Sequence, residues 1–205
     1  MRRHALIPLM ITLLVIALAL PFANAGKVFT WDYTKFNTST PDYRELDEAT
    51  TSLSFEIINK LTFNTSTTGA KAVVQICNGT SGTIYHLDIV LVCDKTLEVV
   101  LNMPTYIKIA TGTWEYNETI YVSINSDGDL YVRSGDNVVI DDYNIGTFTM
   151  RALAGSGVDY ACTSGYLSVD LGHYEVNNVI SEWIPAIVSI AMLGVAIGMI
   201  KKYTQ

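Results

Sequence analysis

The feature that most constrains the fold is a period-two alternation of apolar residues that runs from Lys27 to Tyr174. Successive side chains of a strand point to opposite faces, so this spacing predicts strands that each bury one face. The alternating runs are Leu53/Phe55/Ile57, Tyr85/Leu87/Ile89/Leu91, Leu97/Val99/Leu101, Ile107/Ile109, Ile120/Val122/Ile124, Leu130/Val132, Val138/Ile140 and Leu167/Val169/Leu171. Glycine-rich and Asp-Gly turns separate them, which favours an antiparallel sandwich or barrel. We predict an all-β fold, an antiparallel β-sandwich (jelly roll).

One segment, Phe36–Ala49, does not follow the alternation. It is polar and contains Pro41. We expect a loop here, or a single helical turn around Tyr43–Glu48.

The N-terminus has the pattern of a secretory signal. Met1–His4 is basic, Ala5–Leu20 is apolar, and Ala23-Asn24-Ala25 forms an A-x-A site before Gly26. This pattern predicts a cleavable signal peptide over residues 1–25. An uncleaved signal anchor is the alternative.

The C-terminal part contains a second apolar block. Residues 184–200 carry no charge and cover about 25 Å as a helix, which is enough for a short membrane span. Trp183 before the block and Lys201-Lys202 after it fit the interfacial-aromatic and positive-inside patterns. We therefore predict an extracellular β-sandwich over 26–182, one transmembrane helix over 183–200 and a cytoplasmic tail over 201–205. A buried core helix is the alternative.

The predicted span carries a small-residue motif. Gly194 and Gly198 form a G-x-x-x-G, a spacing that lets two membrane helices approach closely. These two residues are candidates for transmembrane packing in a homo-oligomer. Ordinary tolerance of glycine in membrane helices is the other interpretation.

Charge excludes one class of partner. The chain has 13 basic and 20 acidic residues. Arg2, Arg3 and the two C-terminal lysines lie outside the predicted β-domain, which is therefore strongly acidic. Such a domain repels phosphate, so nucleic-acid binding is not expected.

A resemblance to a known family rests on residues 114–174. The hairpin Ile120–Val132, then Gly135, Val138–Ile140 and Gly146–Phe148, resembles the central hairpins of concanavalin A-like and laminin G-like jelly rolls. The closing segment, Gly165–Leu171 followed by Tyr174, is similar to the last strand of that family. The resemblance implies binding of a glycan or a protein on the concave face or rim loops, often with calcium. No set of calcium ligands can be carried over to this sequence.

The sequence contains three cysteines in a predicted oxidising compartment. Cys77, Cys93 and Cys162 allow at most one intramolecular disulfide, and the sequence does not choose among the three pairings. Three buried, unpaired thiols are the alternative.

Four N-x-S/T sequons predict a glycosylated surface. Their acceptor residues are Asn37, Asn64, Asn78 and Asn117. Unmodified polar turn residues are the alternative.

Catalytic and metal-binding signals are weak. His86 and His173 lack metal-ligand spacing, and no nucleophile or zinc motif is present. The cluster Asn125–Asp129 fits a hairpin turn better than a calcium loop. Asp141 and Asp142 are adjacent on a strand, so they point to opposite faces. We expect no enzyme activity, no metal and no cofactor.

Tyr121 and Tyr131 are candidate binding residues. Their neighbours in the chain are apolar and expected to point inward, so both rings should share the outer face of a meander. They are either an ordinary cross-strand pair or a platform for a sugar ring or a partner.

Together these patterns predict a type I membrane-anchored surface glycoprotein in a cell membrane or viral envelope. Its β-sandwich would act in adhesion and recognition of a glycan or surface protein, or in surface assembly. The alternatives are a structural envelope or spike protein of a virus, a surface-layer or pilus subunit, and a membrane-tethered glycan-processing enzyme.

Overall fold

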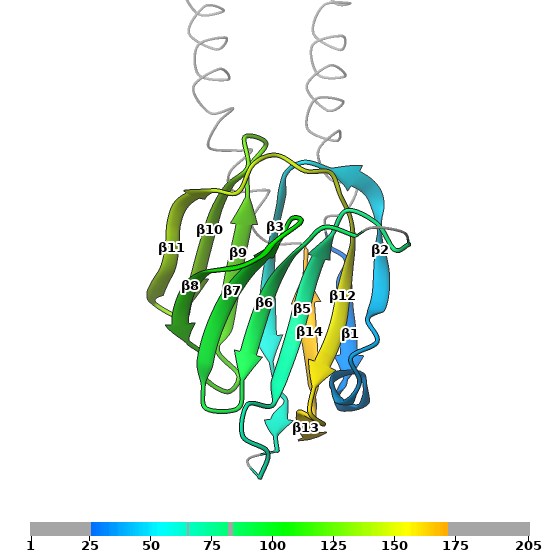
Figure 1. The fold of residues 1–205 in the computed structure, drawn as a ribbon, viewed down its shortest axis with the longest axis vertical. Coiled ribbons are helices and arrows are strands. Elements are labelled where there is room, and N and C mark those ends of the chain that lie inside the picture. Colours follow the sequence, from blue (N-terminus) through cyan, green and yellow to red (C-terminus); the bar gives the residue numbers. More distant parts are fainter. Residues whose placement is uncertain (1–25, 65, 82–83, 172–205) are drawn as a thin grey trace, which may run out of the picture.

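A computed structural model describes residues 26–64, 66–81 and 84–171 (Figure 1). Across sheet A the strands are β1 (Val28–Asp32), β14 (Tyr166–Asp170), β3 (Leu53–Asn59), β9 (Thr119–Ile124), β10 (Asp129–Ser134) and β11 (Asn137–Asn144). Across sheet B they are β2 (Asp42–Thr50), β12 (Met150–Val158), β5 (Lys71–Cys77), β6 (His86–Val92), β7 (Thr96–Asn102) and β8 (Tyr106–Thr113). The short strands β4 (Thr62–Phe63) and β13 (Cys162–Ser164) pair with each other.

The two large sheets are stacked face to face (Figure 1). All the strand pairs of the described residues are antiparallel. The prediction of an all-β, antiparallel fold is thereby confirmed.

The core fills the space between the sheets and follows the predicted alternation. Phe55 and Ile57 of sheet A and Ile89 and Leu91 of sheet B are at most 1% exposed. They belong to a single large cluster of buried side chains. Burying one face of each strand in this way is the main stabilising contribution in a sandwich.

The expectation for Phe36–Ala49 is wrong. Residues 42–50 form strand β2, and the short 3-10 helix η1 lies earlier, at Tyr33–Asn37. β2 is the edge strand of sheet B, and Leu46 is its one buried residue. An edge strand exposes most of its side chains to solvent, so its sequence lacks the apolar alternation used to recognise strands.

Helix η1 closes one end of the sandwich against β12. Phe36 is fully buried, and the N–H of Gly157 donates a hydrogen bond to the carbonyl of Thr38 at 2.8 Å. A Cβ atom at position 157 would lie 1.7 Å from the carbonyl oxygen of Phe36. Only glycine allows so close an approach of the two backbones.

Several sequence predictions fall outside the described residues. These are the signal peptide 1–25, the membrane span 183–200 with Gly194 and Gly198, and the tail 201–205. Among the described residues, no helix has the length and apolar character needed to span a bilayer.

Candidate functional site

The predicted tyrosine pair lies on the outer face of sheet A. The rings of Tyr121 on β9 and Tyr131 on β10 pack against each other, with centroids 5.9 Å apart. Tyr121 is only 7% exposed. This geometry is that of a cross-strand aromatic pair, and a binding role for the two residues stays a prediction.

Asn37, the first sequon residue, connects η1 to β13. Its Nδ2 atom donates to the carbonyl of Cys162, and its Oδ1 atom accepts from the N–H of the same residue, both at 2.9 Å. The carboxamide thus takes the position that a neighbouring strand would occupy beside β13. We infer that Asn37 has a structural role in the folded chain.

The other three sequons lie in turns. Asn64 accepts a hydrogen bond from the N–H of Ser66 at 3.1 Å, and Asn78 accepts one from the N–H of Tyr85 at 2.9 Å. Asn117 is exposed and has a positive φ of 62°. Glycosylation of these residues stays a prediction.

The three cysteines are free thiols. Cys77 pairs with His86 at one end of the β5–β6 hairpin, and the N–H of Cys93 binds the carbonyl of Ala70 at the other end. At about 3.3 Å per strand residue, these ends are roughly 20 Å apart, which excludes a disulfide between Cys77 and Cys93. Burial raises the pKa of the Cys77 thiol and of the Cys162 thiol to about 12.

The polar groups of the acidic turn between β9 and β10 are bound by the turn's own residues and by Asn144 of β11. Asn125 Oδ1 accepts from the N–H groups of Asp127 and Asp129, both at 2.9 Å. The side-chain amides of Asn125 and Asn144 donate to the Asp129 carboxylate at 2.9 and 2.7 Å, and these bonds lower its pKa. Among the described residues, no three His, Cys, Asp or Glu side chains are grouped to hold a metal ion.

A different surface, the outer face of sheet B, brings polar side chains together. Two neighbouring rows cross this face from β2 to β8. The first row is Glu45, Ala152, Cys77, His86, Asn102 and Tyr106, and the second is Tyr43, Ala154, Gln75, Asp88, Val100 and Lys108. We call these twelve residues the sheet B face.

At the centre of the sheet B face, His86 is held by its neighbours on both sides. Its Nδ1 atom lies 2.6 Å from the Asp88 carboxylate, and its Nε2 atom lies 2.8 Å from Nδ2 of Asn102. Gln75 Nε2 donates to the same Asp88 oxygen at 3.3 Å. With the Asn102 amide as the donor to Nε2, Nδ1 carries the proton that is directed at Asp88. The network fixes the orientation of His86 and Asn102, which are both partly exposed.

Small residues form the floor beside this network. Ala152, Ala154 and Cys77 are fully buried, and the half-buried Tyr43 packs against them. Burial raises the pKa of Tyr43, and the neighbouring Cys77 adds to the effect. This floor is buried and uncharged, and it lies between Tyr43 and the hydrogen-bonding network of His86.

Cys77, His86 and Asp88 are neighbours on the sheet B face, but they do not form an activated nucleophile. Burial and then the Asp88 charge raise the pKa of Cys77 to about 12, so the thiol stays protonated at neutral pH. The Nε2 atom of His86 is already engaged by Asn102. This arrangement can donate and accept hydrogen bonds, but it lacks the thiolate that nucleophilic catalysis needs.

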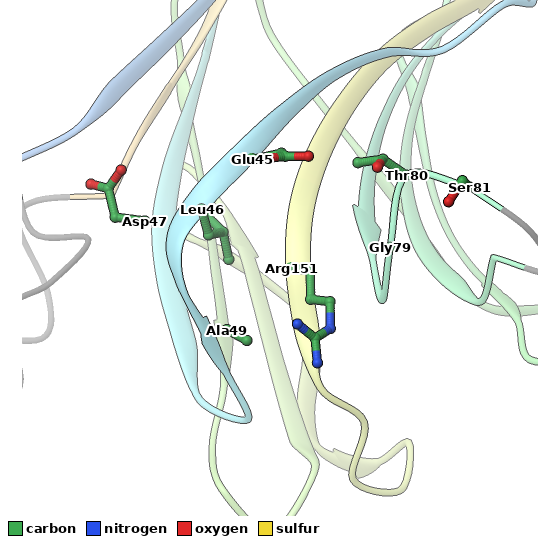
Figure 2. Close-up of a pocket in the computed structure, with 8 residues that line it drawn as sticks. All are labelled: Glu45, Leu46, Asp47, Ala49, Gly79, Thr80, Ser81 and Arg151. Atoms are coloured by element: carbon green, nitrogen blue, oxygen red, sulfur yellow. The ribbon is translucent and has the colours of Figure 1, made fainter.

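A pocket of about 390 Å³ adjoins the floor. Glu45 pairs with Ala152 and Thr50 pairs with Met150, so residues 46–49 of β2 lie opposite Arg151 alone. β2 therefore arches away from β12. The pocket lies between this arch and the loop after β5, and Arg151 points into it (Figure 2). Bulges of this kind often lie beside functional sites.

Most of the residues that line the pocket are polar. Besides Arg151, the lining residues are Glu45, Leu46, Asp47, Ala49, Gly79, Thr80 and Ser81. Figure 2 shows the Glu45 side chain directed toward Thr80, whereas Asp47 points to the other side of β2. The Asp47 carboxylate is bound there by Lys27 at 2.5 Å.

The sequence predicts neither the arch of β2 nor the position of Arg151 in the pocket. The relevant signal is the run of polar residues around Leu46, whose pattern predicts a loop or a helical turn. The partners of His86 also lie on three strands, so their meeting depends on a register that the sequence does not specify.

Comparisons with known proteins identify similar folds. No family model matches the chain. No curated protein matches it either. The chain is similar to the carbohydrate recognition domain of Emp46p in its potassium-bound form, with 13% identity over 73% of this chain and 88% of that chain and a TM-score of 0.45.

The chain is also similar to two further solved structures. One is the carbohydrate binding module CBM66 from Bacillus subtilis, with 11% identity over 69% of this chain and 91% of that chain and a TM-score of 0.42. The other is the LG4-5 segment of the mouse laminin alpha1 chain, with 14% identity over 69% of this chain and 40% of that chain and a TM-score of 0.37. The predicted resemblance to concanavalin A-like and laminin G-like jelly rolls is confirmed as a likeness of fold.

Proposed function

We propose that this protein recognises a glycan through the sheet B face and the adjoining pocket. The observation that carries the proposal is the network in which Asp88 and Asn102 hold His86 at 2.6 and 2.8 Å. It provides polar side chains that are already oriented before a ligand arrives. Such preorganisation lowers the entropy lost on binding.

The chemistry of the surface fits a sugar. A sugar ring has hydroxyl groups at its edge and C–H groups on its faces, so it needs both hydrogen-bonding and aromatic partners. His86 and Asn102 supply the former, and Tyr106, which is 60% exposed, lies beside Asn102 on β8. Half-buried Tyr43 lies at the other end of the sheet B face.

We infer binding rather than catalysis. A glycosidase needs two convergent carboxyl groups, one of them with a raised pKa. Beyond the sheet B face on β7, burial would raise the pKa of Glu98, but hydrogen bonds from Lys108 and Lys71 outweigh burial and lower it. This shift is opposite to the one that a general acid requires.

The cellular setting is part of the same proposal. A cleaved signal and a C-terminal span would place the β-domain outside a cell membrane or viral envelope as a glycoprotein. There it would act in adhesion or recognition. A structural envelope protein, a surface-layer or pilus subunit and a membrane-tethered enzyme remain alternatives.

The test is binding of the full chain, in detergent micelles, to an array of immobilised glycans. Tyr106→Ala removes an exposed ring at the sheet B face, and Tyr143→Ala removes a 45% exposed ring from β11 of sheet A. Both are edge-strand tyrosines, which makes them a matched pair. We expect Tyr106→Ala to weaken glycan binding by about tenfold or more, the size of a typical hot-spot loss, and Tyr143→Ala to leave it unchanged.

A third variant tests the other sheet. Tyr131→Ala should bind glycans like the wild type if the sheet B face is the site. A loss confined to Tyr131→Ala would instead place recognition on the tyrosine pair of sheet A. Absence of binding to any glycan on the array would refute the proposed function.

A further inference from the structure

Arg151 differs from the other cationic side chains of the described residues in having no partner. The lysines and the other arginines are all engaged: Lys27 with Asp47, Lys35 and Arg44 with Asp42, Lys71 and Lys108 with Glu98, Lys95 with Glu115, Lys60 over the ring of Tyr166, and Arg133 in a contact of its own. Within the described residues, the Arg151 guanidinium has neither a carboxylate at ion-pair distance nor an aromatic ring in stacking range.

This lack of a partner is unexpected in so acidic a chain, which has 20 acidic residues against 13 basic ones. Glu45 and Asp47 both line the same pocket as Arg151. Asp47 is drawn away by Lys27, and Glu45 is directed toward Thr80 (Figure 2). The pocket therefore keeps a guanidinium free of the carboxylates that surround it.

We propose that the Arg151 pocket binds a sugar residue that carries a carboxylate, such as a uronic acid. This inference rests on the proposed function and specifies the class of glycan. The guanidinium forms two parallel hydrogen bonds with a carboxylate, a geometry that a neutral hydroxyl cannot reproduce. Glu45, Thr80 and Ser81 then face the ring hydroxyls.

The acidic surface of the domain strengthens the preference of an anionic sugar for the Arg151 pocket. Elsewhere on the domain an anionic sugar meets excess negative charge, and such repulsion works against binding at other positions. The pocket volume of about 390 Å³ lies within the range of small-molecule sites. The sheet B face would bind the neighbouring sugar residues of the same glycan.

The test compares galacturonic acid with galactose and glucuronic acid with glucose, each as an immobilised glycoside and as a soluble competitor. These pairs differ only in the carboxylate. The full chain is produced without N-glycans, because Thr80 belongs to the Asn78 sequon and lines the pocket. We expect the wild type to prefer each uronate by about tenfold, which corresponds to about 1.4 kcal/mol.

Three variants make the test specific. Arg151→Gln should lose the preference, so that it binds each uronate no better than the matching neutral sugar. Arg151→Lys should retain part of the preference, because an ammonium supplies charge without the bidentate geometry. Arg133→Gln, on β10 of sheet A, removes the same charge elsewhere and should keep the full preference.

The outcomes separate this inference from the proposed function. Equal binding of uronates and neutral sugars by the wild type would overturn the inference and leave glycan recognition standing. A uronate preference that survives in Arg151→Gln would also overturn it. Failure of both acidic and neutral sugars to bind would refute glycan recognition itself.

Discussion

Replacing Asn37 with alanine should destabilise the fold although the residue lies in a predicted glycosylation sequon. Its carboxamide makes two hydrogen bonds of 2.9 Å to the backbone of Cys162, a residue that is only 3% exposed. Each bond is worth about 1 kcal/mol net, and a buried group left unpaired costs roughly 1–3 kcal/mol. We therefore expect Asn37→Ala to lower the free energy of unfolding by about 2–4 kcal/mol.

For a chain of this size, such a loss lowers Tm by roughly 5–15 °C. Thermal unfolding of the full chain, followed by circular dichroism in detergent at neutral pH, measures it. Ser39→Ala is the matched control, because it destroys the same sequon at an exposed position and leaves the Asn37 carboxamide in place.

Two results would contradict this reasoning. If Asn37→Ala and Ser39→Ala lower Tm equally, an attached glycan and not the carboxamide stabilises the fold. If Asn37→Ala unfolds within about 0.5 kcal/mol of the wild type, the two hydrogen bonds add nothing beyond an ordinary surface contact.

Three further predictions concern other parts of the molecule. At pH 8 iodoacetamide should label the partly exposed Cys93 faster than the buried Cys77 and Cys162, because the raised pKa values of these two keep their thiols protonated. Peptide mass mapping after timed labelling measures this order. Gly157→Ala should prevent correct folding or lower the free energy of unfolding by more than about 4 kcal/mol, because its Cβ would lie 1.7 Å from the Phe36 carbonyl oxygen. A soluble variant with wild-type Tm would contradict this close approach of η1 and β12. The pKa of Glu98 is lowered on folding, so its ionised form stabilises the protein above its ordinary pKa of 4.5 and this contribution disappears as the pH falls through the folded value. Glu98→Gln should be less stable than the wild type at pH 7, and the difference should shrink below pH 4.5 in denaturant titrations.

The fold was predictable where a strand buries one face. In β3 and β9 the alternation of Phe55 and Ile57, and of Ile120 and Val122, is a direct consequence of packing against the opposite sheet. β2 was not predictable by the same signal. As an edge strand it buries only Leu46, so nothing in its pattern distinguishes it from a polar loop.

The candidate site was not predictable for a related reason. The polar residues that alternate with the core positions all appear alike in the sequence, as the solvent side of strands. Their chemistry depends on which of them become neighbours, and that is set by register. His86 meets Asp88 on its own strand but meets Asn102 and Gln75 only because β7 and β5 flank β6.

Register also explains why Arg151 is available to a ligand. Had β2 continued in step with β12 beyond the Glu45–Ala152 pair, residue 46 would pair with Arg151, and the backbone of β2 would close the space that the pocket occupies. Residues 46–49 lie opposite Arg151 alone and turn the space into a pocket, and Leu46 anchors the arch in the core. The register irregularity between β2 and β12 therefore creates the pocket. Deleting residues 47 and 48 should shorten the arch and close the pocket while the sandwich core stays intact.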